Sequence, residues 1–162
     1  MRKILALLSF SLLAAAPSLH AAGSVEVTYV EPEKFMDIGF GSVDRKIALD
    51  EMSAILKRLG EKLPDGQTLK LEVTHINLAG EVRPGAGRDI RVLTGTADWP
   101  EVTLRYTLQA GGQTLKSGEA KVYDIAYLTN ATFVDRVGTN LPYERHMLRK
   151  WFAATFGNAP QP

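Results

Sequence analysis

The chain has 162 residues, with 19 basic and 18 acidic side chains and no cysteine. Its near-neutral charge predicts no general attraction to nucleic acid or to anionic membranes. The lack of cysteine excludes disulfides, zinc–thiolate sites, cysteine nucleophiles and cysteine-linked lipid anchors, so the fold must be stabilised by packing.

Residues 1–21 have the layout of a secretory signal peptide. Arg2 and Lys3 precede an apolar run, residues 4–16, which ends at Pro17 and is followed by the small-residue sequence SLHAAG. The run is too short to span a bilayer. The alternative is a buried N-terminal helix, which the absence of a polar helical face disfavours.

We predict cleavage after Ala21. Cleavage after Ala22 would place His20 at a position that prefers small neutral residues. The exported remainder, residues 22–162, has a suitable length for one domain. We expect a soluble periplasmic protein without a lipid anchor.

The exported chain begins with a predicted strand and a predicted amphipathic helix. Apolar and polar residues alternate in SVEVTYVE, residues 24–31, as in a half-buried strand. Pro32 then opens a turn or short helical segment. Ser42 is the expected N-cap of a helix over residues 43–62, in which apolar residues recur at helical spacing. The helix is expected to end near Gly60 or at the Pro64-Asp65-Gly66 turn.

The next strand changes phase partway along. In TLKLEVTHINL, residues 68–78, the apolar side chains shift from one parity to the other. This shift predicts either a bulge near Thr74 and His75 or inward-pointing side chains at His75 and Asn77.

A hairpin follows in the second half of the chain. EVTLRYTLQ, residues 101–109, alternates throughout, and Gly111 and Gly112 predict a tight turn into QTLKSGEAKVYDIAYL. A parity change in that second strand predicts a bulge at Ser117 and Gly118.

The last element is a predicted helix over residues 142–156. Pro142 suits its first turn, Gly157 ends it, and NAPQP forms a frayed tail. Its apolar stripe could lie on a membrane surface, but packing on the sheet is the interpretation we favour, because the half-apolar strands need a cover. The sequence therefore predicts a single two-layer α+β domain, with a mainly antiparallel sheet and two amphipathic helices on one face.

The glycine-rich stretch over residues 80–100 is predicted to be a connector. Gly85-Ala86-Gly87-Arg88 lacks the Lys-Ser/Thr of a phosphate loop and the third glycine of a dinucleotide turn. Its Arg and Asp side chains could pair with each other, with Trp99 partly buried at the core edge. Alternatively, charged and aromatic residues here and near the end of the hairpin could contact a partner; these candidate binding residues are Arg88, Asp89, Arg91, Trp99, Asp124 and Tyr127.

Residues suited to catalysis are scarce. There is no Gly-x-Ser-x-Gly elbow and no histidine pair at metal-ligand spacing, so we expect no cofactor and no metal. Asp37, Asp124 and Glu144 are carboxylates set among aromatic residues, and an acid/base pair would require them to converge. For Asp37 and Asp124 we expect capping and turn roles. His75 is expected at an irregular strand position, and His146 on a solvated basic helix face.

Several segments together resemble a known family. VEVTYVEPEKFMDIG, LAGEVRPG, RDIRVL, DWPEVTLRYTL, GEAKVYDIAYL and YERHMLRKWF occur in this order along nearly all of the exported chain. In these segments the chain resembles a family of exported proteobacterial proteins catalogued only as a domain of unknown function. The resemblance implies export and a single α/β domain, and it brings no activity, cofactor or catalytic residue.

We expect a non-enzymatic binding or accessory module of the bacterial envelope, with another envelope protein as its partner. No contact with nucleic acid or with a membrane surface is expected. The alternative hypothesis is a periplasmic hydrolase that uses acidic residues or His75.

Overall fold

The computed structural model describes residues 22–39, 41–85, 90–131, 135 and 137–157. The strands are β1 (Ser24–Tyr29), β2 (Gln67–Asn77), β3 (Glu81–Arg83), β4 (Ile90–Val92), β5 (Glu101–Ala110) and β6 (Gln113–Tyr123). The helices are the 3-10 turn η1 (Pro32–Lys34), α1 (Ser42–Gly60), α2 (Tyr127–Asn130) and α4 (Pro142–Phe156).

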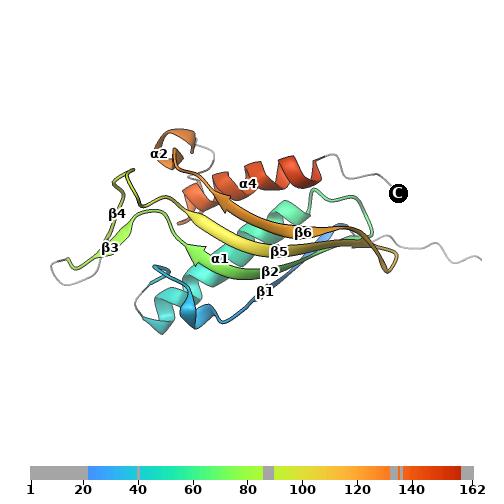
Figure 1. The fold of residues 1–162 in the computed structure, drawn as a ribbon, viewed down its shortest axis with the longest axis horizontal. Helices are drawn as coiled ribbons and strands as arrows, with labels where there is room; N and C mark the ends of the chain where they lie inside the picture. The colour runs from blue at the N-terminus through green and yellow to red at the C-terminus, as the bar shows by residue number, and fades with distance from the viewer. Residues whose placement is uncertain (1–21, 40, 86–89, 132–134, 136, 158–162) are drawn as a thin grey trace, which may run out of the picture.

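The main sheet has four strands in the order β1-β2-β5-β6. β1 and β2 are parallel and are connected through α1, whereas β2, β5 and β6 pair antiparallel. β3 and β4 form a separate two-stranded ribbon beyond the end of the main sheet (Figure 1). The predicted α+β domain with a mainly antiparallel sheet is confirmed.

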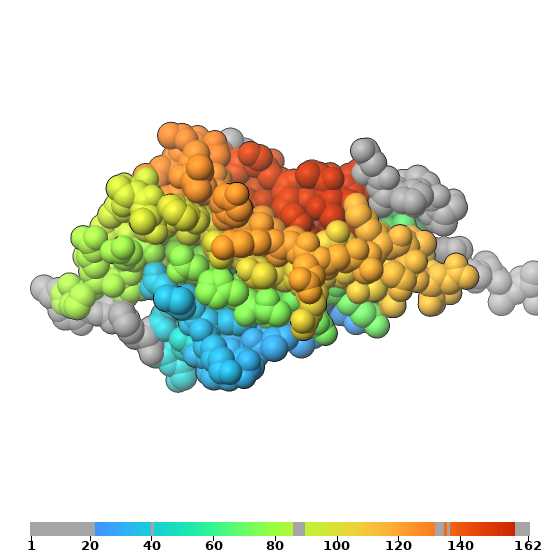
Figure 2. Space-filling model, viewed as in Figure 1, coloured from blue at the N-terminus to red at the C-terminus, as the bar shows by residue number. Residues whose placement is uncertain are grey.

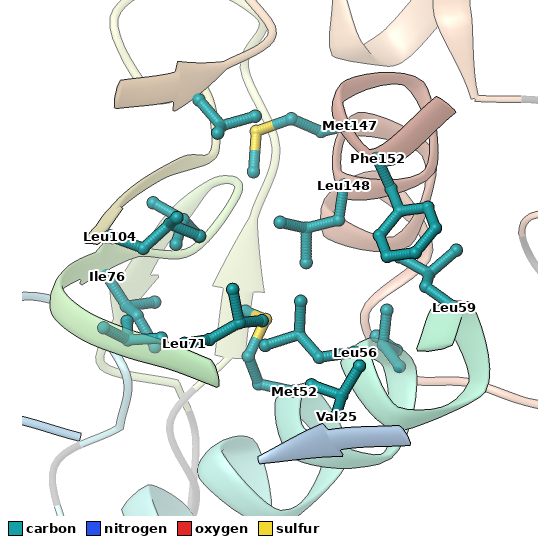
Figure 3. Packing of buried hydrophobic residues seen from close by; sticks show 14 of the residues in the cluster. Val25, Met52, Leu56, Leu59, Leu71, Ile76, Leu104, Met147, Leu148 and Phe152 are labelled. Carbon is teal, nitrogen blue, oxygen red and sulfur yellow. The ribbon is translucent and has the colours of Figure 1, made fainter. Parts of the chain in front are cut away.

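Both long helices cover the same face of the main sheet (Figure 1). Met52 and Leu56 of α1 and Leu148 of α4 point towards Leu71 and Leu104 of the sheet (Figure 3). All five side chains are at most 2% exposed. The apolar stripe of α4 is thus part of the core, as expected for a helix that packs on the sheet.

The ends of α1 differ slightly from the prediction. Gly41, not Ser42, is the N-cap, and no side chain caps this end; Ser42 is already the first helical residue. The helix ends at Gly60, as predicted. A Cβ atom on Gly60 would lie 2.3 Å from Cγ2 of Val25, so glycine lets the end of α1 approach β1 closely.

The phase change in β2 results from a bulge. Val73 pairs with Leu104 and His75 pairs with Thr103, which leaves Thr74 as the extra residue. The Thr74 hydroxyl donates to the Thr103 carbonyl at 3.2 Å. Of the two alternatives, the bulge near Thr74 and His75 is therefore the correct one.

The β5–β6 hairpin turns at the predicted glycines, but its bulge lies elsewhere. Gly111 and Gly112 have φ values of 56° and 78°, as a two-residue hairpin turn of this kind requires. The predicted bulge at Ser117–Gly118 is wrong: the extra residue is Leu115, which lies between Thr114 and Lys116 without a partner on β5. The parity change marks a bulge but not the residue at which it occurs.

The other face of the main sheet carries polar side chains. Three cross-strand ion pairs lie on it: Lys70–Glu26 at 3.9 Å, Arg105–Glu72 at 2.9 Å and Lys121–Glu101 at 3.0 Å. One face of an antiparallel sheet commonly faces water in this way.

Candidate functional site

Arg91 of β4 fastens the β3–β4 ribbon to the rest of the domain. Its guanidinium pairs with the Asp37 carboxylate, with 2.9 Å between Nη1 and Oδ2. The same group donates to the carbonyls of Ala79 at 3.1 Å, Gly80 at 3.0 Å and Asp37 at 2.7 Å. Asp37 has a φ of 49°, a costly conformation for a residue other than glycine, and these contacts help to hold it.

Glu144, near the start of α4, contacts the same backbone segment at Ala79 that Arg91 contacts. Its side chain is buried, and Oε1 accepts a hydrogen bond from the Ala79 amide at 2.7 Å. Burial raises the pKa of Glu144, while the hydrogen bond from Ala79 and the positive charge of Arg91 act in the opposite direction. Arg91 and Glu144 thus fix the backbone here together: Glu144 accepts from the Ala79 amide, and Arg91 donates to the carbonyls of Ala79 and Gly80.

Asp98 and Tyr127 shape the turn that leads into β5. Asp98 is 3% exposed and accepts from the amides of Thr94 at 2.6 Å and Thr96 at 3.1 Å. Burial by itself would raise the pKa of Asp98, but its hydrogen bonds from Thr94 and Tyr127 outweigh burial and lower it. Burial raises the pKa of Tyr127 to about 12. The Tyr127 oxygen accepts from the Gly95 amide at 3.2 Å.

The remaining predicted binding residues lie near this turn. Trp99 is half-buried, as predicted, and its carbonyl accepts from the side chain of Asn77 at 3.4 Å. The Asp124 Oδ1 atom accepts from the Ala126 amide at 3.1 Å and from Asn130 Nδ2 at 2.7 Å. Asp124 thus has a turn role ahead of α2, whose N-cap is Ala126 without a side-chain cap.

The four predicted binding residues that the structure describes, Arg91, Trp99, Asp124 and Tyr127, thus have separate structural partners. Arg91 belongs to the Asp37 network, whereas Tyr127 belongs to the Asp98 turn. Arg88 and Asp89 lie outside the described residues. Arg91 does not pair with an aspartate of its own loop, because its partner Asp37 belongs to the segment before α1.

The three residues proposed for hydrolysis have separate partners. Asp37 is paired with Arg91, and Asp124 accepts hydrogen bonds from Ala126 and Asn130 in the turn at α2. His75 lies in the bulged part of β2 opposite Thr103. Within the described ranges, no three His, Asp or Glu side chains come together to hold a metal ion.

His146 is not on a solvated helix face, and that prediction is wrong. The residue is 7% exposed, and its Nδ1 lies 2.9 Å from Oδ2 of Asp135, itself 2% exposed. Because the carboxylate can only accept, Nδ1 carries the proton and donates it. The helical period placed His146 beside Arg145 and Arg149, but in the structure its ring is buried and contacts Asp135.

The β3–β4 ribbon and the start of α1 lie at the same end of the molecule, at the left in Figure 2. An apolar groove is lined by residues of both. We call it the end groove. Its volume is about 360 Å³, and its apolar lining consists of Ile38, Gly39, Ile47, Ala48, Leu78, Val82, Ile90 and Leu141. Asp44, Glu51, Arg91 and Asn140 are its polar lining residues.

Large apolar side chains at the end groove are exposed. Ile47 is 53% exposed and Ile90 is 45% exposed, and Val43, one turn before Ile47 on α1, is 68% exposed. Sequence reasoning missed these residues. A signal was available for two of them, because Val43 and Ile47 are four residues apart and off the apolar stripe of their helix.

Comparisons with known proteins agree with the resemblance in the sequence. The family model described as "Protein of unknown function (DUF3016)" matches residues 23–154. No match was found among curated proteins or among solved structures. None of the described helices has the length and apolar character needed to cross a membrane.

Proposed function

The chain belongs to the DUF3016 family, which has no assigned function, and from this premise we propose that it is a non-catalytic binding module of the bacterial envelope. Its binding surface is the end groove. The partner is another envelope protein that inserts apolar side chains there.

The observation that carries the proposal is the exposure of Ile47 and Ile90, which line one groove, with the exposed Val43 one helical turn before Ile47. Isolated exposed apolar residues are common on protein surfaces, whereas contiguous apolar patches mark interaction sites. Ile47 and Ile90 come from different elements, yet they line the same groove. Burying apolar surface contributes about 25 cal/mol per Å², so a partner would gain from covering them.

Contacts within the chain itself hold the segments that line the groove. Arg91 fastens the β3–β4 ribbon to the segment before α1. On the other side, the Glu51 carboxylate accepts hydrogen bonds from Thr139 and from the amide and side chain of Asn140. A fixed surface loses little conformational entropy on binding, which favours affinity.

The alternative hypothesis, a periplasmic hydrolase, has less support. An acid/base pair must lie within hydrogen-bond reach of one reacting group. Asp37, Asp124 and His75 belong to separate elements, and each aspartate already accepts structural hydrogen bonds. The groove itself offers mainly aliphatic side chains, which suit contact with a partner better than proton transfer.

Site-specific photo-crosslinking in intact cells would test the proposal. A photoreactive amino acid would replace Ile47 or Ile90, with position 115 as the matched control. Leu115 is 43% exposed, close to the value for Ile90, but it lies near the turn of the β5–β6 hairpin at the opposite end of the molecule (Figure 1). We expect one discrete adduct from positions 47 and 90, and none from position 115.

A second variant makes the result specific to the groove. Ile47→Glu places a charge in the groove while keeping a good helix former in α1, so crosslinking from position 90 should be lost without loss of folding. Adducts of equal yield from positions 90 and 115, or an adduct unaffected by I47E, would argue against the proposal. An adduct of twice the chain mass would identify the partner as a second copy of this chain instead.

A further inference from the structure

A cleft between α1 and α4 gathers basic side chains from both helices. Arg58 of α1 and Lys62, which lies two residues past the end of α1, line one side of it. Arg145 and Arg149 line it from α4. The two arginines are four positions apart and share one face of α4, so two pairs of cations line the same cavity of about 220 Å³.

Two of these cations are positioned by the chain itself. Nη2 of Arg149 lies 3.1 Å from Oδ1 and 3.2 Å from Oδ2 of the buried Asp135. Arg145 Nη1 donates to the Val137 carbonyl at 2.9 Å. Because His146 also donates to Asp135, the carboxylate that holds Arg149 is fixed in turn. Asp135 and His146 are thus positioning residues for Arg149.

The other two cations of the cleft are differently placed. Arg58 and Lys62 are exposed, and within the described part of the chain neither has a carboxylate at ion-pair distance. Glu51 also lines the cleft, but its oxygens accept from Thr139 and Asn140. Positive charge is therefore in excess around the cleft.

The interior of the cleft is apolar. Ala54, Ile55 and Leu59 line it from α1, between the two pairs of cations. Its 220 Å³ lies below the range of roughly 300–1,000 Å³ that is usual for drug-sized ligands. A suitable ligand is therefore small, with an anionic group for the cations and a compact apolar body.

We propose that this cleft binds a small organic anion, namely a carboxylate or phosphate monoester with an apolar body of about one ring. Arg58 and Lys62 would contact the anionic group directly, and Arg149 would add a donor held by Asp135. Arginine is well suited to this role, since its planar guanidinium can bind carboxylate and phosphate oxygens in pairs.

This inference does not rest on the proposed function. Arg58, in the second half of α1, and Lys62, just past its end, do not line the end groove. Replacing them leaves the groove intact, and I47E leaves the cleft cations in place. Failure of one proposal can therefore be told from failure of the other.

Titrations monitored by NMR would test the inference, with benzoate and phenyl phosphate as probes and with benzamide and inorganic phosphate as controls. Benzamide keeps the ring without the charge, and phosphate keeps the charge without the ring. We expect saturable shifts of amides in α1 and α4 with one or both organic anions, and at least tenfold weaker binding of both controls. The stronger of the two organic anions identifies the ligand as a carboxylate or a phosphate monoester.

Variants would assign the binding to the cleft. Arg58→Ala with Lys62→Ala should weaken binding at least tenfold, since a hydrogen bond to a charged group contributes about 1.5–3 kcal/mol. Ala54→Trp should block the cleft without removing charge, because Ala54 is exposed and lines it. Lys57→Ala and Lys150→Ala are the matched controls: each lies next to a cleft cation but does not line the cleft.

Three results would overturn the inference. One is the absence of saturable shifts with both benzoate and phenyl phosphate at millimolar concentration. Another is benzamide binding as strongly as benzoate, and the third is an equal loss of affinity in the Lys57→Ala control. Binding of an acidic peptide in place of both small anions would instead assign the cleft to a protein partner.

Discussion

The guanidinium of Arg91 lies 2.9 Å from the carboxylate of Asp37, although 54 positions separate the two residues in the sequence. The pair connects β4 to the segment between η1 and α1. It lies at the end of the molecule where the β3–β4 ribbon and the end groove are found. This relationship leads to the first prediction.

Arg91→Ala should destabilise the domain by about 1–3 kcal/mol, because buried acceptors at Ala79 and Gly80 lose a charged donor together with the ion pair. Urea denaturation measures the change. Arg83→Ala is the control: Arg83 pairs with Glu81 on the exposed ribbon, and such pairs contribute about 0–1 kcal/mol. Equal effects of both variants would show that the Arg91 network does not anchor the ribbon.

Glu144→Gln should make stability less dependent on pH. The folded pKa of Glu144 is raised, so its contribution is fully present below the unfolded pKa and is lost as pH rises through the folded pKa. Glutamine keeps an oxygen for the Ala79 amide but does not ionise. The free energy of unfolding of E144Q relative to the wild type should therefore increase from acidic to neutral pH.

Denaturation curves at a series of pH values would measure this difference. Glu119→Gln, on the exposed part of β6, is the control and should show no such trend. A difference for E144Q that stays constant or decreases with pH would contradict a raised pKa at Glu144.

Trp151→Ala should destabilise the domain by about 3 kcal/mol, at the lower end of the range for large aromatic truncations in cores. Trp151 is half-buried and packs edge-on against Tyr106 and Phe156, with ring centroids 6.1 and 5.5 Å apart. Thermal or urea unfolding measures the loss, with Lys150→Ala as the neighbouring exposed control. Unchanged stability of W151A would restore the hypothesis that α4 lies on a membrane surface.

Export can be tested directly on the protein in cells. If residues 1–21 are a signal peptide, osmotic shock should release a chain whose first residue is Ala22. N-terminal sequencing or mass spectrometry of the released fraction gives the answer. Full-length chains beginning at Met1 in the cytosol would refute both the export and the periplasmic location.

Much of the fold could be predicted from the sequence because secondary structure depends on local periodicity. Alternation in β5 and the apolar stripes of α1 and α4 each follow from the side-chain period of one element. The turn at Gly111 and Gly112 was also predictable, since positive φ favours glycine. These local patterns also determined the two-layer arrangement, because each apolar face must be buried against another.

Other features were decided only by the tertiary structure. Periodicity indicated a bulge in β6, but pairing with β5 decides that the extra residue is Leu115. His146 has the helical position of a solvated residue, yet it is buried and its ring contacts Asp135, 11 positions earlier in the chain. The end groove and the cleft between α1 and α4 each combine segments that are distant in the chain. Burial and convergence depend on which surfaces meet in space, and no local pattern encodes that.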